Sequence, residues 1–274
     1  MTVTSSEFLF TKLRCPVCGQ AMDTKEASAI CRGLSAHCFD FAKSGYLNLT
    51  AGHGGMGDLK DATDARHRFL SKGYYSILSD RIVELLSEAE PSSILDAGCG
   101  EGSYTNKLAA VAPVIGIDLS KSGILLAAKE AKRQSLPALY LVASLFTLPV
   151  ANESFSAVTN LFAPCAEAEF CRILEENGLL LVVGAGKEHL MGLKRTLYDD
   201  PRINPGREDL PNTMQLIKKE TLTGNIRVAK EDIEDLFAMT PYYFRTSKKD
   251  HDKLSGLEYL DTEIAFDLFL YRKN

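Results

Sequence analysis

Thiol and imidazole side chains gather near the start of the chain at spacings that suit a metal ion. Cys15 and Cys18 form a CxxC pair, Cys31 follows, and His37 and Cys38 are adjacent. Two such pairs separated by about 12–20 residues are typical of a tetrahedral Zn²⁺ site. We therefore predict a structural zinc ion on Cys15, Cys18, Cys31 and either His37 or Cys38. The alternatives are free buried cysteines and a redox pair, and the redox pair lacks the strand–helix context that it needs.

A second chemical signature is the run Asp-Ala-Gly-Cys-Gly-Glu-Gly from Asp96 to Gly102, which follows a short apolar segment. Its glycines let the backbone turn sharply and let a ligand approach closely. A helix is expected next, and its first N–H groups lack intrahelical partners. Asp118 ends the following apolar segment, where an acid accepts hydrogen bonds from ribose hydroxyls in dinucleotide-type folds. The pattern predicts a cofactor that contains a nucleoside.

The spacing of these glycines separates two cofactor classes. Nicotinamide-binding loops have the pattern G-x-G-x-x-G, whereas here the glycines are spaced evenly by two and follow an acid. Asp-x-Gly-x-Gly-x-Gly resembles motif I of class I methyltransferases, which bind S-adenosyl-L-methionine (SAM). We therefore expect SAM, with a dehydrogenase as the competing interpretation.

Two further strand ends carry candidate side chains. Ser144 follows the third apolar strand, where methyltransferases of this class place a group beside the adenine. Asn160 and Phe162 end the fourth strand, and ligands bind outside the carboxyl ends of parallel strands. We predict these two as the catalytic residues. Asn160 would bind cofactor or substrate, and Phe162 would stack on an acceptor base, with core packing as its alternative.

The elements that must position these side chains alternate along the chain from about residue 92. Short apolar runs alternate with helical patterns, which predicts an α/β fold with a mostly parallel sheet and helices on both faces. The expected strands are 93–97, 113–117, 139–143, 156–162, 179–183 and 262–271, and the expected helices are 104–111, 121–132, 167–174, 188–197 and 231–239.

The composition and the apolar pattern of the sequence change twice along the chain, which predicts three regions. Residues 1–50 have only short apolar runs and can hardly build a core without a metal, so we expect a small zinc-binding domain. Residues 51–90 begin with the Gly-rich stretch Ala51–Gly57 and continue as an amphipathic helical pattern from Phe69 to Leu85. Residues 91–274 would form the Rossmann-like catalytic domain.

Composition and charge are those of an ordinary globular protein. The formal net charge is -5, which argues against RNA binding through bulk charge but leaves room for a local basic face. No apolar run approaches the ~18 residues of a membrane helix, and the start lacks a signal-peptide pattern, so we expect a cytoplasmic protein without membrane contact. Candidate RNA contacts are Lys12, Arg14, Arg66, Arg68, Lys187, Lys194 and Arg195.

Several segments together resemble one family over nearly the full length of the chain. It is the RlmA family of 23S rRNA (guanine-N1)-methyltransferases, which includes a macrolide- and tylosin-resistance branch. Antibiotic resistance is therefore one expectation. The matching segments are Cys15–Cys18, Phe39–Leu49, Ala65–Arg66, Phe69–Tyr75, Leu95–Gly102, Phe162–Cys165, His189–Lys194 and Met239–Pro241.

This resemblance implies a zinc domain that helps to recognise a hairpin loop of 23S rRNA, and a homodimer that forms an RNA-binding cleft. It implies zinc ligands at Cys15, Cys18, Cys31 and His37, although the last two stand further apart here than the family usually has them. It adds Tyr75 and His189 as cofactor contacts. The full predicted set is Tyr75, Asp96, Gly98, Cys99, Gly100, Glu101, Gly102, Ser103, Tyr104, Asp118, Ser144, Asn160 and His189.

The expected reaction is methyl transfer from SAM to N1 of a guanine, which must lose a proton as it attacks. The sequence offers no unambiguous general base, so positioning of the acceptor is expected to supply much of the acceleration. Two other functions remain open at this point. One is a small-molecule methyltransferase, and the other is a non-catalytic RNA- or ribosome-binding protein with a methyltransferase fold.

Overall fold

A computed structural model describes residues 5–50 and 59–274, and the Gly-rich stretch Ala51–Gly57 lies outside them. The central sheet of the described residues is formed by β4 (Leu47–Asn48), β5 (Ile94–Ala97), β6 (Val114–Asp118), β7 (Ala138–Val142), β8 (Phe155–Leu161), β9 (Leu174–Ala185), β10 (Gln215–Ala229) and β11 (Tyr259–Arg272). Its spatial order is β10-β11-β9-β8-β5-β6-β7-β4. Neighbours from β9 to β4 pair in parallel, and β11 runs antiparallel to both β9 and β10. The predicted Rossmann-like α/β fold is confirmed.

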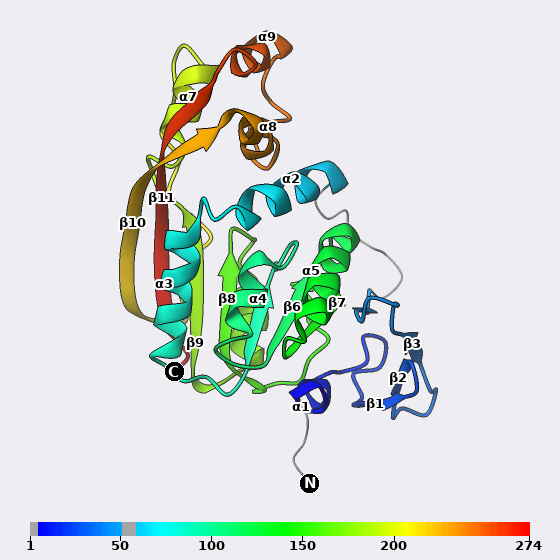
Figure 1. The fold of residues 1–274 in the computed structure, drawn as a ribbon. Coiled ribbons are helices and arrows are strands. Elements are labelled where there is room, and N and C mark those ends of the chain that lie inside the picture. The colour runs from blue at the N-terminus through cyan, green and yellow to red at the C-terminus, as the bar shows by residue number, and fades with distance from the viewer. Residues whose placement is uncertain (1–4, 51–58) are drawn as a thin grey trace.

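Helices cover both faces of this sheet (Figure 1). The helices of the described residues, of which α2, α8 and α9 lie beyond one end of the parallel strands, are α1 (Ser5–Thr11), α2 (Lys60–Ser71), α3 (Ser76–Ser87), α4 (Ser103–Leu108), α5 (Lys121–Gln134), α6 (Glu167–Ile173), α7 (Met191–Leu197), α8 (Lys230–Ala238) and α9 (Lys248–His251). Alternate residues of β5 enter two different cores, because successive side chains of a strand point to opposite faces. Ile94 packs with α3 and α4, whereas Leu95 packs with α1 and α6. No helix in the two described ranges is long and apolar enough to cross a membrane.

The N-terminal region has its own small sheet but shares the core of the main domain. Strands β1 (Met22–Lys25), β2 (Ser28–Cys31) and β3 (Cys38–Asp40) form a three-stranded antiparallel sheet. The neighbouring β4 instead pairs with β7 of the central sheet, and Leu13 forms a bridge with Val150. Leu9 and Leu13 are fully buried in the core that contains Leu95. The expectation that this region lacks a sufficient core of its own agrees with this packing, and the predicted domain limits stay predictions.

The helical pattern expected after the Gly-rich stretch forms two helices, not one. Gly73 has φ +82°, in the left-handed region, and it separates α2 from α3. Figure 1 shows α2 lying across the end of the sheet toward which the arrow of β8 points. An ion pair from Arg68 to Asp235 (2.5 Å) and another from Lys72 to Asp232 hold α2 against α8. The carboxyl ends of the parallel strands therefore have a helical cover.

One long element has no counterpart in the sequence prediction. Strand β10 pairs with β11 over almost its whole length, from Gln215 opposite Arg272 to Ala229 opposite Tyr259. Most of its side chains are exposed or half-buried, since it lies at the edge of the sheet and mixes lysine, threonine and glutamate with few apolar residues. Leu222, Ile226 and Val228 nevertheless lie on one face at period two and pack on the core, a short apolar alternation that could have indicated the strand.

Candidate cofactor site, acceptor side and metal centre

The glycine loop between β5 and α4 adopts a conformation that requires glycine at two positions. Gly98 has φ +85° and Gly102 has φ +84°. A Cβ atom at Gly98 would lie 2.3 Å from Cβ of Ala163, and one at Gly102 would lie 2.5 Å from Cβ of Ala127. The loop therefore packs directly against the segment after β8 on one side and against α5 on the other. This close approach explains why side chains are missing there.

Asp118 stands at the carboxyl end of β6 and is tied to the same loop. Its carboxylate accepts hydrogen bonds from the N–H of Gly100 (3.0 Å) and from the N–H of Ser120 (2.7 Å). A carboxylate has acceptor capacity beyond these two bonds. The sequence prediction of an acid beside the loop thus agrees with the geometry, and Asp118 is oriented so that ribose hydroxyls could share its oxygens.

The other two acids of the motif are buried and serve the loop itself. Asp96 accepts hydrogen bonds from the hydroxyls of Thr105 (2.5 Å) and Thr159 (2.7 Å), which ties β5 to α4 and β8. Burial raises the pKa of Asp96 to about 6, although the two hydroxyls act in the opposite direction. Glu101 accepts from the N–H of Ser103 (3.3 Å) at the start of α4. Cys99 is buried in the core against α5.

Tyr75 and His189, far apart in the sequence, lie in direct contact. The Tyr75 hydroxyl is 3.2 Å from Nε2 of His189, and Nδ1 of His189 accepts the N–H of Ala265 (3.2 Å). Burial, with a smaller effect of the nearby Lys194 charge, lowers the pKa of His189 to about 4. The imidazole is therefore neutral near pH 7 and carries its proton on Nε2, where it donates to Tyr75. The proton of the Tyr75 hydroxyl remains available for another acceptor.

A narrow hollow of about 30 Å³ lies between the α2–α3 turn and the start of α4. Tyr75, Ser103 and Tyr104 are among its lining residues. The Tyr104 hydroxyl is buried and has no hydrogen-bond partner among the residues that the structure describes. Unpaired buried polar atoms are rare in proteins, and water, an ion or a bound ligand can supply the partner. This hydroxyl, the side-chain-free glycine loop and the Asp118 carboxylate fit a nucleoside cofactor with a polar tail such as SAM.

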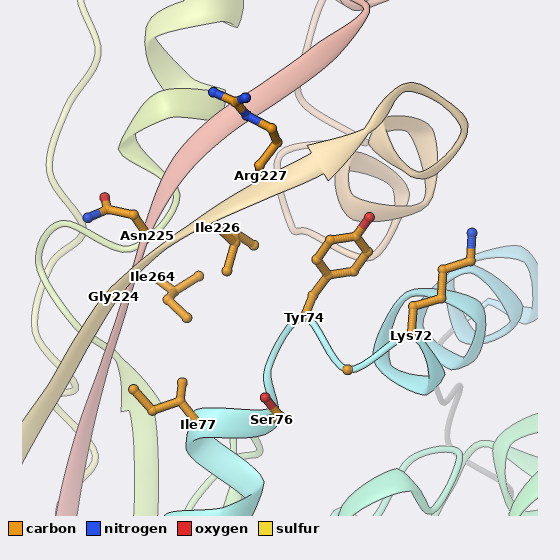
Figure 2. Close-up of a pocket in the computed structure, with 10 residues that line it drawn as sticks. Lys72, Tyr74, Ser76, Ile77, Gly224, Asn225, Ile226, Arg227 and Ile264 are labelled. Carbon is orange, nitrogen blue, oxygen red and sulfur yellow. The ribbon is translucent and has the colours of Figure 1, made fainter.

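A larger hollow of about 360 Å³ lies between the same turn and strands β10 and β11 (Figure 2). Tyr74 and Ile77 line it from the turn and α3, and Asn225 and Arg227 line it from β10. None of the predicted site residues lines this hollow. We therefore do not assign the cofactor to this hollow, although it is the larger of the two.

The segment after β8 presents one of the two predicted catalytic residues to solvent and buries the other. Phe162 has φ +54°, a rare conformation for an aromatic residue, and its side chain is 46% exposed. Asn160 is fully buried. Its amide nitrogen donates to the carbonyls of Ala97 and Pro164, both at 3.1 Å, and its amide oxygen accepts from Arg207 at 2.5 Å. Asn160 thus braces the segment in this structure, and its direct contact with a ligand stays a prediction.

Ser144 lies two residues beyond β7, at the same carboxyl edge, and is half-buried. Its hydroxyl accepts the N–H of Phe146 (3.2 Å). The structure therefore collects the loop, Asp118, Ser144 and Phe162 at the ends of neighbouring parallel strands. Arg207 and Asp209, which contact the segment after β8, escaped the sequence prediction because no motif surrounds them.

Most of the basic side chains expected to contact RNA are already engaged. Lys12 and Lys194 are buried, and Lys194 donates to Oδ1 of Asn204 (2.7 Å). These two corrections have a common cause, because each amino group is held by an acceptor elsewhere in the fold, and that of Lys12 donates to the carbonyl of Ser154 (2.5 Å). Arg68 forms an ion pair with Asp235, Arg195 forms one with Glu263, and Arg14 donates to the carbonyls of Thr11 and Leu13. Lys187 is exposed. Arg66 lies beside the glycine loop, where its Nη1 would be 3.6 Å from a Cβ atom at Gly100.

Four side chains of the N-terminal region converge as a tetrahedral metal site requires. The ligand atoms of Cys15, Cys18, Cys31 and His37 all lie within 4.8 Å of one another. The sulfurs of Cys18 and Cys31 are 3.8 Å apart, and Nδ1 of His37 lies 3.5 and 3.4 Å from the sulfurs of Cys15 and Cys31. Zinc bonded to sulfur at about 2.3 Å and to nitrogen at about 2.0 Å would place its ligands about 3.8 and 3.5 Å apart. The donor set and its spacing fit Zn²⁺.

The adjacent Cys38 takes no part in this cluster. Its sulfur is exposed and lies 4.0 Å from Oδ1 of Asp40. The longer spacing before His37 is accommodated by the loop 32–36, and the N–H of His37 donates to the sulfur of Cys31 (3.2 Å). Of the two residues that the sequence left open, the structure therefore brings His37 to the site.

Comparisons with known proteins identify the two regions of the chain that contain these sites. A model described as a methyltransferase domain matches residues 94–178, and one described as RlmA, N-terminal, matches residues 13–51. YxjB of Bacillus subtilis (strain 168), provisionally named a 23S rRNA (guanine-N(1)-)-methyltransferase, is 30% identical across 96% of this chain and 98% of its own length. A provisionally named 23S rRNA (guanine-N(1)-)-methyltransferase of Micromonospora griseorubida is 27% identical over 87% of this chain and 88% of that protein.

A third relative has a more specific name. The 23S rRNA (guanine(748)-N(1))-methyltransferase of Streptomyces fradiae is 28% identical over 84% of both chains. These similarities extend across the zinc region, the helical cover and the catalytic domain. The chain belongs to the RlmA family of SAM-dependent 23S rRNA (guanine-N1)-methyltransferases.

Proposed function

We propose that this protein transfers the methyl group of SAM to N1 of a guanine in 23S rRNA. The observation that carries the proposal is the combination, in one chain, of a cofactor loop beside Asp118 with a Cys3His cluster of the RlmA type. A small-molecule methyltransferase would need no such N-terminal module. The names of three relatives that match most of the chain support the same substrate.

We propose that Cys15, Cys18, Cys31 and His37 hold Zn²⁺ and that the metal has a structural role. All four positions are protein ligands, which leaves no open position for a reacting group. The zinc would stabilise the loops around the three-stranded sheet. This region would then help to recognise a hairpin loop of the rRNA, as the family resemblance implies.

The chemistry at the acceptor depends on placement. SAM supplies an electrophilic methyl group on its sulfonium sulfur. Guanine N1 must face that methyl group in line and must lose a proton, which a base or stabilisation of O6 can promote. His189 is a poor candidate base because its Nδ1 already accepts a hydrogen bond and its Nε2 donates one. We assign the acceptor side to Phe162, whose exposed ring would stack on the guanine, a contact worth about 1–3 kcal/mol.

We assign the cofactor to the carboxyl edge of the sheet. Asp118 would accept hydrogen bonds from the ribose hydroxyls, and Ser144 would lie beside the adenine. Tyr75, in the turn before α3, and Tyr104, at the start of α4, would offer their hydroxyls to the polar tail of SAM. Each assignment uses a group whose hydrogen-bonding capacity is not fully used within the described structure.

The decisive experiment is methyl transfer from labelled SAM to protein-free 23S rRNA, followed by mapping of the modified base. We expect a single N1-methylguanine in a hairpin loop. Methylation of a metabolite but not of RNA would support a small-molecule enzyme, and SAM binding without transfer would support a non-catalytic RNA-binding protein. Sedimentation of the same preparation tests the proposed homodimer. Expression in a bacterial host, with localisation and macrolide-susceptibility measurements, tests the cytoplasmic location and the resistance phenotype.

A further inference from the structure

The segment 198–214, between α7 and β10, contains no helix or strand, yet it carries a nearly buried arginine. The Arg207 side chain is only 8% exposed. Its aliphatic part lies against Gly184 at the end of β9, where a Cβ atom would lie 3.3 Å from Cβ of Arg207. Irregular segments of this length are uncommon in compact domains, and they are functional segments or linkers. The contacts of the guanidinium group indicate which function this one serves.

The guanidinium group binds β9, the end of β8 and the segment after β8. It donates to the carbonyl of Val183 (2.8 Å), to the carbonyl of Ala163 (2.6 Å) and to the amide oxygen of Asn160 (2.5 Å). Its Nε donates to Oδ1 of Asp209 at 2.8 Å. These bonds use the planar fork of arginine, which a lysine could not reproduce.

Asp209 extends the same contact to the other end of the segment. Its second carboxylate oxygen accepts the N–H of Cys165 (2.8 Å). Arg207 and Asp209 therefore hold residues 160–165 at both ends, and we call this pair the turn clamp. Phe162 lies between the two anchored ends, in its left-handed conformation and half-exposed. A backbone conformation of this kind persists only where surrounding contacts impose it.

The clamped segment also touches the cofactor loop. The methyl group of Ala163 occupies the space in which a Cβ atom of Gly98 would lie, so it packs directly on the backbone of the glycine loop. A shift of residues 160–165 would change the distance between the exposed Phe162 ring and the glycine loop. The reaction needs a fixed distance between the acceptor base and the methyl group.

We propose that Arg207 and Asp209 are positioning residues for the acceptor guanine. They hold residues 160–165, and with them Phe162, at a fixed place beside the cofactor loop. Neither residue is assigned a contact with the reacting atoms. The inference rests on the proposed function, since it concerns the acceptor of that reaction.

The test compares Arg207→Met and Arg207→Lys with a matched control, Arg172→Met. Arg172 also donates to two main-chain carbonyls, of Val150 (2.8 Å) and Leu148 (3.0 Å), and pairs with Glu169 (2.7 Å). It therefore makes the same kind of contacts on α6, without touching residues 160–165. Single-turnover methylation at saturating RNA and SAM, the dissociation constant of SAM, Tm, and hydrogen exchange of the peptide 160–166 are measured for each variant.

We expect Arg207→Met to lower the single-turnover rate about 100-fold, the effect of a misplacement of about 1 Å, with little change in SAM affinity. Arg207→Lys is expected to regain part of the rate. Exchange at residues 160–166 should rise in Arg207→Met and stay unchanged in Arg172→Met, whatever the substrate. If Arg207→Met does not fold, the same comparison is made with Arg207→Lys.

A rate and an exchange profile equal to those of Arg172→Met would show that Arg207 is only a structural staple, and would overturn the proposal. An equal loss of SAM binding and rate would also overturn it, by placing the effect at the cofactor. Wild-type protein that methylates no RNA would refute the proposed function instead. The hydrogen exchange of the segment would still decide whether the clamp exists.

Discussion

Replacement of Gly98 by alanine tests whether the cofactor loop and the segment after β8 are in direct contact. The new Cβ atom would lie 2.3 Å from Cβ of Ala163, whereas real Cβ contacts essentially never fall below 3.0 Å. A left-handed φ of +85° costs a non-glycine residue about 1–2 kcal/mol. Relief of the overlap adds about 1–3 kcal/mol, as for overpacked cores. The expected destabilisation of Gly98→Ala is therefore about 2–5 kcal/mol.

A control variant separates the two contributions. Gly45→Ala introduces the same kind of backbone strain, at φ +95°, but its Cβ atom would meet nothing within 4 Å. We expect it to lose only about 1–2 kcal/mol of unfolding free energy in urea titrations. If about 1.4 kcal/mol of the destabilisation of Gly98→Ala falls on the conformation that binds SAM, the dissociation constant of SAM rises about tenfold. Calorimetry measures that constant, and Gly45→Ala should leave it unchanged.

The contact is refuted if Gly98→Ala loses no more stability than Gly45→Ala and binds SAM as wild-type protein does. That outcome would mean that the loop and residues 160–165 can separate without cost. The turn clamp would then have no contact through which it could affect the position of the cofactor loop.

Three further predictions concern the other groups of the two sites. Asp118→Ala removes a charged acceptor from the loop and should weaken SAM binding by about 10–100-fold in calorimetry, with Tm shifted by only a few degrees; unchanged affinity would contradict the ribose assignment. His37→Ala should lower the zinc content of the purified protein, measured by atomic emission, whereas Cys38→Ser should keep it; the reverse result would exchange the two ligands. The pKa of His189 falls from 6.5 to about 4 on burial, so the unfolded state binds the extra proton first and wild-type stability declines as the pH falls between those values. His189→Gln should lack this part of the decline in urea titrations at several pH values, and an unaltered pH profile would argue against a buried neutral imidazole.

The sequence predicted the parts of the site that follow local rules. Asp96–Gly102 and Asp118 were recognisable because glycines and acids directly after apolar strands have few other uses than a cofactor loop. The structure places them together at strand ends. The same rules failed for Asn160 in one respect. Its position at a strand end was predicted. Its side-chain amide, however, is already hydrogen-bonded within the protein, and one of its partners, Arg207, lies 47 residues away in the chain.

Long-range partners of this kind explain the remaining misses. Nothing near Arg207 in the sequence indicates that its side chain enters the core, because the pockets that receive it are formed by β8 and β9. Lys194 likewise has the sequence environment of a solvated helix residue and is buried against Asn204. Strand β10 pairs with β11 along its length, and its own apolar alternation is confined to Leu222, Ile226 and Val228.

The attachment of the zinc module has a consequence for substrate recognition. β4 adds to the central sheet beside β7, with the N–H of Leu49 donating to the carbonyl of Val142 (2.9 Å), two residues before Ser144. On the other side, the N–H of Arg14 donates to the carbonyl of Pro149 (2.8 Å), next to the first zinc ligand. The module is thus joined at both ends to the strand and loop that lead to the cofactor edge. An rRNA loop bound by this module would be held in a fixed relation to that edge, because no hinge separates the two across the residues that form these bonds. A rigid arrangement of this kind would let contacts at the zinc module contribute to the placement of the acceptor base, the same task that the turn clamp performs from the opposite side of the glycine loop.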